Sequence, residues 1–186
     1  SLTGCFGSPK ETYYTLSTGA TMSGAASASG ESAYSIAVGS ITLPEVVDRP
    51  QFVLRAGKNE VSIVELHRWA EPLRSEIPRI IADNLAAELN VKRVAAHPQS
   101  AGDNADYRVL VDIQRFDSTM GESVTIDALW TVKRVSDGVL RTGRSTARES
   151  GSGGSYDALA AAHSRALATI SREIAEAIRS VNTSAH

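Results

Sequence analysis

The residues that could carry chemistry are few and widely spaced. The chain has a single cysteine, Cys5, so an intramolecular disulfide, a zinc knuckle and a Cys-x-x-Cys redox pair are excluded. Glycine-rich phosphate loops, a Gly-x-Ser-x-Gly nucleophile elbow and a His-Glu-x-x-His metal motif are also absent. The sequence therefore predicts that the protein is not an enzyme and uses no cofactor or metal. The histidines are scattered: His67, His97, His163 and His186.

Three aspartates and one histidine have two interpretations each. Asp112, Asp117 and Asp127 could form a carboxylate pair, but their positions in alternating segments and loops favour solvated side chains. His163 falls on the apolar stripe of a predicted helix, which indicates a hydrogen-bonded core residue rather than a ligand.

Cys5 stands in an irregular segment, since Phe6-Gly7-Ser8-Pro9 follows it. No adjacent histidine or cation would lower its pKa, although a distant one could, so a free thiol or a functional thiol remains open. The preceding Leu2-Thr3-Gly4 resembles a bacterial lipobox, in which small residues precede the cysteine that becomes lipidated. We therefore expect lipid attachment at Cys5, with residues 1–12 forming a lipobox remnant and tether. Two or three acyl chains at this position would hold the protein firmly to a membrane.

Length and charge limit the remaining possibilities. A chain of 186 residues predicts one domain, which we place at residues 13–182. A net charge of -2 argues against a nucleic-acid partner. The longest unbroken apolar run, 158–162, is far shorter than the roughly 20 residues of a spanning helix.

Short strands and one helix are predicted in the first half. Strand patterns occur at 13–16, 36–41, 51–55 and 61–64, and residues 17–32 have the composition of a loop. An amphipathic helix follows, with Ser75 as its N-cap, Pro78 in its first turn and its end near Asn90. Its spacing puts Glu76 on the polar side.

The second half alternates more strictly. Segments 107–113, 124–132 and 139–148 predict a three-stranded antiparallel meander, in which Leu129 is an exception to the alternation. Ser155 then offers a cap for a long helix with an apolar stripe from Leu159 to Val181. This order of elements predicts a mixed sheet with helices packed against it.

Two blocks between residues 38 and 85 are specific: Asp48-Arg49-Pro50-Gln51 and Arg68-Trp69-Ala70-Glu71-Pro72-Leu73, with Val38 to Pro44 and Asn84-Leu85 around them. Together these blocks resemble the PqiC/YmbA lipoproteins, the ABC-type transport auxiliary lipoproteins. The resemblance implies a three-layer α/β/α fold with a mixed sheet of about five strands, similar to the N-terminal domain of TolB. The long Gly/Ala/Ser loop after Ser17 departs from the family pattern.

The resemblance implies a docking role beside an MCE-domain protein in lipid transport across the Gram-negative envelope. Phe6 after the cysteine, where enteric lipoproteins kept in the inner membrane have Asp, favours the periplasmic face of the outer membrane. Arg49, Gln51 and Arg55 could donate hydrogen bonds to a partner or to lipid phosphates, and Trp69 suits either an interface or the core. A lipid carrier with its own acyl-chain cavity is the alternative function, and a homo-oligomer is possible.

Overall fold

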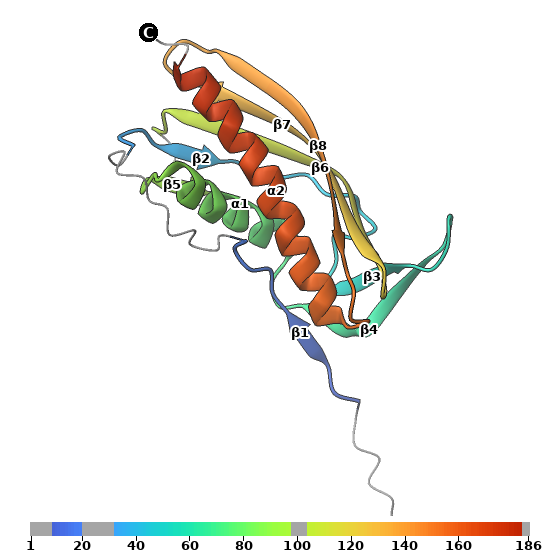
Figure 1. Cartoon of the computed structure of the whole chain (residues 1–186). Helices are drawn as coiled ribbons and strands as arrows, with labels where there is room; N and C mark the ends of the chain where they lie inside the picture. The colour runs from blue at the N-terminus through green and yellow to red at the C-terminus, as the bar shows by residue number, and fades with distance from the viewer. Residues whose placement is uncertain (1–8, 20–31, 98–103, 184–186) are drawn as a thin grey trace, which may run out of the picture.

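The computed structural model describes residues 9–19, 32–97 and 104–183. Its larger sheet has five strands in the order β5 (Val94–Ala96), β2 (Ile36–Val38), β6 (Tyr107–Thr119), β7 (Ser123–Arg134) and β8 (Leu140–Ser150). Strand β2 runs parallel to β5 and β6, whereas β6, β7 and β8 form the predicted antiparallel meander. The sheet is therefore mixed, and β8 forms its long outer edge (Figure 1).

A smaller sheet of three strands lies at the end of the molecule from which the N-terminal segment leaves (Figure 1). Its order is β1 (Thr12–Tyr14), β4 (Val61–Trp69) and β3 (Gln51–Arg55). Strands β3 and β4 form an antiparallel hairpin that projects from the body, and β1 pairs with β4 in parallel.

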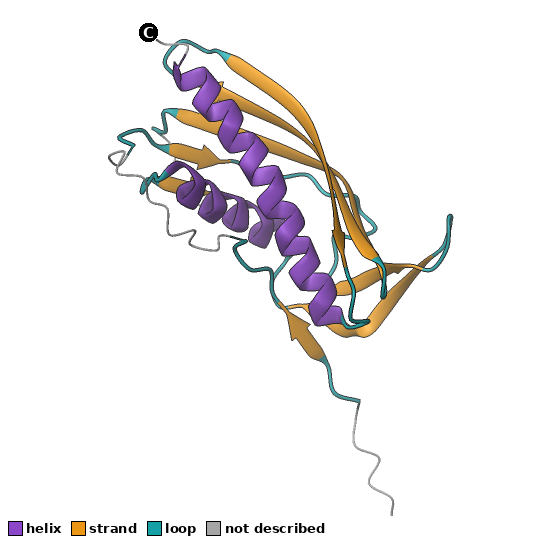
Figure 2. Cartoon of the chain, in the orientation of Figure 1, coloured by secondary structure: helices purple, strands orange, loops and turns teal. Residues whose placement is uncertain are grey.

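Both helices pack on the same face of the five-stranded sheet (Figure 2). Helix α2 (Tyr156–Thr183) lies against β7 and β8, and α1 (Leu73–Leu89) packs between α2 and the β2–β5 edge. The predicted α/β class and the mixed sheet of five strands are confirmed. The layering differs from the α/β/α expectation, because no helix among the described elements lies on the other face, whose exposed side chains include Leu110 and Leu140.

The helix ends follow local backbone chemistry. Helix α1 begins at Leu73, after Pro72, so Ser75 is in the first turn and is not the predicted N-cap. Pro72 takes the cap position with an extended backbone (φ −56°, ψ 129°), and its carbonyl oxygen accepts the Ser75 N–H at 2.9 Å. At the other end Asn90 adopts a left-handed conformation (φ 51°), which ends the helix where the sequence predicts. The predicted cap of α2 is confirmed, because Ser155 Oγ accepts the Ala158 N–H at 3.1 Å.

A bulge in β6 changes which residues face the core. The register with β7 shifts between Ile113 and Arg115, so odd-numbered residues point inward before the shift and even-numbered residues after it. Phe116 and Ser118 consequently face the helices, and Arg115 and Asp117 join the outer face. Glu76 also differs from expectation, since residues at the N-terminal side of the chain cover it and its side chain is fully buried.

Candidate interaction surface

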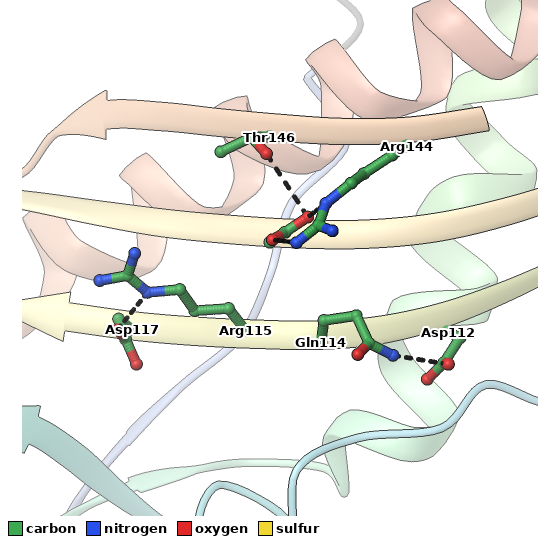
Figure 3. A network of polar contacts seen from close by, with 7 residues as sticks. Asp112, Gln114, Arg115, Asp117, Arg144 and Thr146 are labelled. Carbon is green, nitrogen blue, oxygen red and sulfur yellow. Dashed lines mark hydrogen bonds and ion pairs between the residues drawn. The ribbon is translucent and has the colours of Figure 1, made fainter.

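The face of the five-stranded sheet opposite the helices, hereafter the outer sheet face, carries a network of charged and polar side chains (Figure 3). Asp127 on β7 accepts hydrogen bonds from two guanidinium nitrogens of Arg144 on β8, with Nε at 2.9 Å, and a longer one from Thr146. These bonds from Arg144 hold the pKa of Asp127 below its ordinary value. Asp127 is therefore a charged group whose charge is matched by its neighbour.

The other two aspartates of this face have partners of their own. Asp117 accepts a hydrogen bond from Arg115 Nε at 2.5 Å and lies 3.2 Å from Arg55 Nε on β3. Asp112 accepts a hydrogen bond from Gln114 Nε2 at 2.6 Å (Figure 3). The three carboxylates are thus bound by separate donors and do not form the carboxylate pair considered from the sequence. Each of these aspartates is therefore paired with a donor on the same face of the sheet.

Exposed leucines lie among these charges. Leu110 on β6 is 57% exposed and Leu129 on β7 is 40% exposed. Leu110 pairs with Thr131, two residues from Leu129, so the leucines are diagonal neighbours on the same face. The sequence pattern makes Leu129 the exception to the alternation of its strand. In the structure its side chain lies on the sheet face that no described helix covers.

The polar candidate residues lie along β3 and the turn before it. Gln51 Nε2 donates to Glu65 Oε2 at 3.2 Å, and Arg55 bridges to Asp117 on the outer sheet face. Arg49 is half-buried, and its Nε is buried without a hydrogen-bond partner among the described residues. The structure therefore places these three residues along one edge, with Arg55 adjoining the outer sheet face.

Trp69 is separate from that edge because it lies in the core. Its side chain is only 5% exposed and stacks on Phe52, with the ring centroids 4.2 Å apart. Packing was one of the two roles left open by the sequence, and an indole buried in this way presents no surface to a partner.

One arrangement that the sequence did not predict is a serine–histidine contact. His163 Nε2 on α2 lies 2.7 Å from Ser118 Oγ on β6, and the imidazole stacks on Phe116 at 3.9 Å. Both side chains are buried, and Nδ1 of His163 has no hydrogen-bond partner among the described residues, so none of these supplies an acidic group that orients the ring as in a catalytic triad. Burial lowers the pKa of His163 to about 3. The contact therefore serves the core, as expected for a hydrogen-bonded core histidine.

Cavities and ligand clusters are limited in the described part of the chain. A cleft of about 320 Å³ between α1 and β5 is lined by polar groups that include Arg79, Asp83 and His97. Residues 9–19, 32–97 and 104–183 contain no group of three side chains able to hold a metal ion.

No helix within these residues is long and apolar enough to cross a bilayer. Cys5, the predicted lipid-attachment residue, lies outside the described residues.

These features define an α/β domain with one helix-covered sheet face and one face of paired charges and leucines that no described helix covers. Known structures share this fold. One is a crystal structure of an uncharacterized protein, with 18% identity and a TM-score of 0.73, covering 91% of this chain and 99% of its own. Another is protein XCC0632 from Xanthomonas campestris, of family DUF330, with 19% identity and a TM-score of 0.68, covering 88% of this chain and 92% of its own. No curated protein matches the sequence.

The model of the family "ABC-type transport auxiliary lipoprotein component" matches residues 14–175. Because the match spans most of the chain, the protein belongs to this family of lipoproteins. The resemblance found in the two signature blocks is confirmed, and with it the assignment to an auxiliary component of ABC-type transport.

Proposed function

We propose that the protein is an outer-membrane lipoprotein that docks an MCE-domain protein of an ABC-linked lipid transport system from the periplasmic side. Membership of the transport auxiliary family carries this proposal. Acylated Cys5 is the attachment to membrane lipid, and the folded body is the part that meets the partner. In this role the protein performs no reaction of its own and needs no cofactor.

The outer sheet face supports docking as the main activity. It combines paired charges, such as Asp127 with Arg144, with the exposed Leu110 and Leu129, and no described helix covers it. Apolar side chains set among charged groups resemble the composition of a non-obligate protein interface. Contact through this face would use Arg55 at its border, in keeping with the candidate residues from the sequence.

The alternative, a lipid carrier, has less support. A carrier needs an apolar pocket that surrounds acyl chains. The cleft of about 320 Å³ has charged side chains in its lining, including Glu71, Arg79 and Asp83. We therefore place the contribution of this protein in docking. A homo-oligomer remains a prediction, and the size of the assembly can be measured in the same preparation as the partner.

Cross-linking and affinity capture from envelopes that express the full-length precursor test the proposal. We expect an MCE-domain or ABC-transport component to be recovered with the wild type. Leu129→Asp is expected to reduce recovery at least about fivefold, because it puts a charge into the apolar part of the interface. Ile63→Asp on β4, at a residue with a similar exposure of 42%, is the matched control and should not change it.

Two results would overturn the proposal. An abundant wild-type lipoprotein that recovers no transport component contradicts docking, and lipid bound to the isolated body without any partner favours the carrier. The anchor is tested separately by Cys5→Ala in the precursor, which should move the body from the membrane fraction to the soluble fraction. Unchanged membrane association would refute lipid attachment at Cys5.

A further inference from the structure

Residues 12–19, hereafter the strap, begin at the small sheet and continue along α1 and α2, whose side chains both bind them. The first part is β1, which pairs with β4 in parallel, and the Ala70 N–H donates to the Tyr14 carbonyl oxygen at 2.8 Å. The Tyr14 hydroxyl also forms a hydrogen bond of 2.8 Å with His67 Nδ1. The strap is therefore fastened at its start by main-chain pairing at the edge of the small sheet.

Side chains from both helices bind the main chain of the second part. The Leu16 N–H donates to Glu76 Oε1 at 2.8 Å, the Ser17 N–H to Ser164 Oγ at 3.0 Å and the Gly19 N–H to Asn84 Oδ1 at 3.1 Å. The acceptors of this clamp are Glu76, Asn84 and Ser164, and all three side chains are buried. Bonds to amide groups depend on the path of the backbone, so the clamp recognises an extended segment in one position.

The ring of Tyr14 packs against Phe52, with the ring centroids 5.3 Å apart, and it adjoins the core. After Tyr14 the strap has few side-chain contacts to add to these bonds. Leu16 is the buried apolar residue of residues 15–19, while Thr15, Ser17 and Thr18 are exposed. Gly19 must be small, because a Cβ atom there would lie 2.3 Å from Cβ of Ala168. The fit of residues 15–19 therefore depends mainly on the clamp and on close approach at Gly19, and Leu16 alone adds hydrophobic burial there.

The clamp also carries an electrostatic cost. Glu76 is fully buried, its Oε2 has no hydrogen-bond partner among the described residues, and Arg79 Nη2 is 3.8 Å from Oε1. If the strap left, water could hydrate the Glu76 carboxyl group. This hydration would partly compensate for the loss of the hydrogen bond from the Leu16 N–H. A segment with one buried side chain, Leu16, one half-buried ring, Tyr14, and such an offset is expected to open without unfolding of the core.

We propose that the strap is a releasable segment that sets the length of the membrane tether. This inference rests on lipid attachment at Cys5, as in the proposed function. With the strap seated, seven residue steps join Cys5 to Thr12, a span of at most ~25 Å at about 3.6 Å per residue. Release as far as Gly19 doubles the steps to fourteen and the span to at most ~50 Å. The body can then reach a partner farther from the membrane.

Hydrogen exchange on the unlipidated full chain tests the clamp. We expect the amides of Leu16, Ser17 and Gly19 to be protected in the wild type. Gly19→Val should raise their exchange rates at least about tenfold while the amides of β6 to β8 keep theirs. Gly57→Val is the matched control, since a Cβ atom there meets only Glu60 at 3.7 Å, and it should leave the strap protected.

Ser164→Ala, which removes one acceptor of the clamp, provides a second variant and should increase strap exchange in the same direction. Wild-type strap amides that exchange as fast as an unstructured peptide would overturn the proposal. Exchange that occurs only together with the amides of the core would do the same, because the strap would then not open as a separate unit.

Energy transfer from a dye on the body to acceptor lipids tests the spacer, with lipidated protein on vesicles of phosphatidylethanolamine and phosphatidylglycerol. Gly19→Val should lower transfer efficiency relative to both the wild type and Gly57→Val. Equal efficiencies in all three proteins would refute the spacer even if the clamp opens. A Cys5→Ala protein that still binds these vesicles would instead contradict lipid attachment at Cys5. The experiment therefore separates failure of the proposed function from failure of the spacer.

Discussion

His163 is expected to make the protein less stable in acid. The imidazole is fully buried between Phe116 and Trp69, and within the described part of the chain its Nδ1 has no partner that would stabilise a proton. Burial lowers the pKa of His163 to about 3, from an ordinary value of 6.5 in the unfolded chain. Protonation therefore favours the unfolded chain. The stability due to neutral His163 is complete above about pH 6.5 and is lost as the pH falls from there toward 3.

The size of this effect follows from the two pKa values. Between pH 7.5 and pH 5.0 the unfolded chain takes up most of a proton at this position, whereas the folded chain takes up almost none. Linkage then gives a loss of about 2 kcal/mol in the free energy of unfolding. Asp127 and Asp137, whose pKa values are lowered, titrate below this window and add little to it.

Urea unfolding of the wild type and His163→Gln at pH 7.5 and pH 5.0 measures this effect. The Gln variant loses ring stacking on Phe116 and is less stable at both pH values, so the relevant quantity is the difference between the two pH dependences. We expect the wild type to lose about 2 kcal/mol more than the variant on acidification. Ser118→Ala is the control, since it removes the hydrogen bond and retains the titrating group.

Ser118→Ala combined with His163→Leu supplies an apolar replacement if His163→Gln does not fold. Equal pH dependences in the wild type and a folded His163 variant would refute the reasoning, because they would mean that the imidazole titrates alike in both states. A Ser118→Ala protein that loses the acid sensitivity would also contradict it, since the cause assigned here is burial of the ring.

Other perturbations have sharper structural causes. Gly143→Val should lower the free energy of unfolding by about 1–3 kcal/mol and shift the tryptophan fluorescence, because a Cβ atom there lies 2.2 Å from Cζ2 of Trp130. Asp127→Asn should cost less than about 1 kcal/mol in urea unfolding, since its partner Arg144 is 62% exposed. Burial raises the pKa of Glu76, so this residue makes the wild type less stable as the pH rises above 4.5. Glu76→Gln should lack that decrease when stability is followed from pH 4.5 to 8, and an unchanged profile would contradict it.

The meander and the last helix were predictable because their patterns are long and consistent. Residues 124–132 alternate almost without exception, and the stripe from Leu159 to Val181 keeps helical spacing over most of α2. The inward residues of both patterns are buried, apart from Trp130, which is half-buried against the core. Local periodicity is sufficient here because one face of each element meets the same core.

Features created by contacts between distant residues were not predictable in this way. After the bulge at Ile113, the even-numbered residues of β6 face the core instead of the odd-numbered ones. Ser118 therefore points inward and contacts His163, which is 45 residues away in the sequence. Strand β5 has only three residues, and its pairing with β2 defines it more than its composition does. Glu76 has helical spacing typical of an exposed residue, but the strap, some 60 residues earlier, covers it.

The residues most specific to the family resemblance are largely occupied within the chain. Trp69 packs on Phe52, Asp48 forms an ion pair of 2.5 Å with Arg74, and Arg68 lies 3.1 Å from Glu11 beside the strap. Their interactions explain why these blocks identify the fold, because they join the small sheet to α1 and to the tether. A side chain that packs inside the protein contributes little to recognition outside it. The outer sheet face keeps Leu110 and Leu129 exposed, and the sequence signal for it was an apolar residue at an outward position of each strand, Leu110 in β6 and Leu129 in β7.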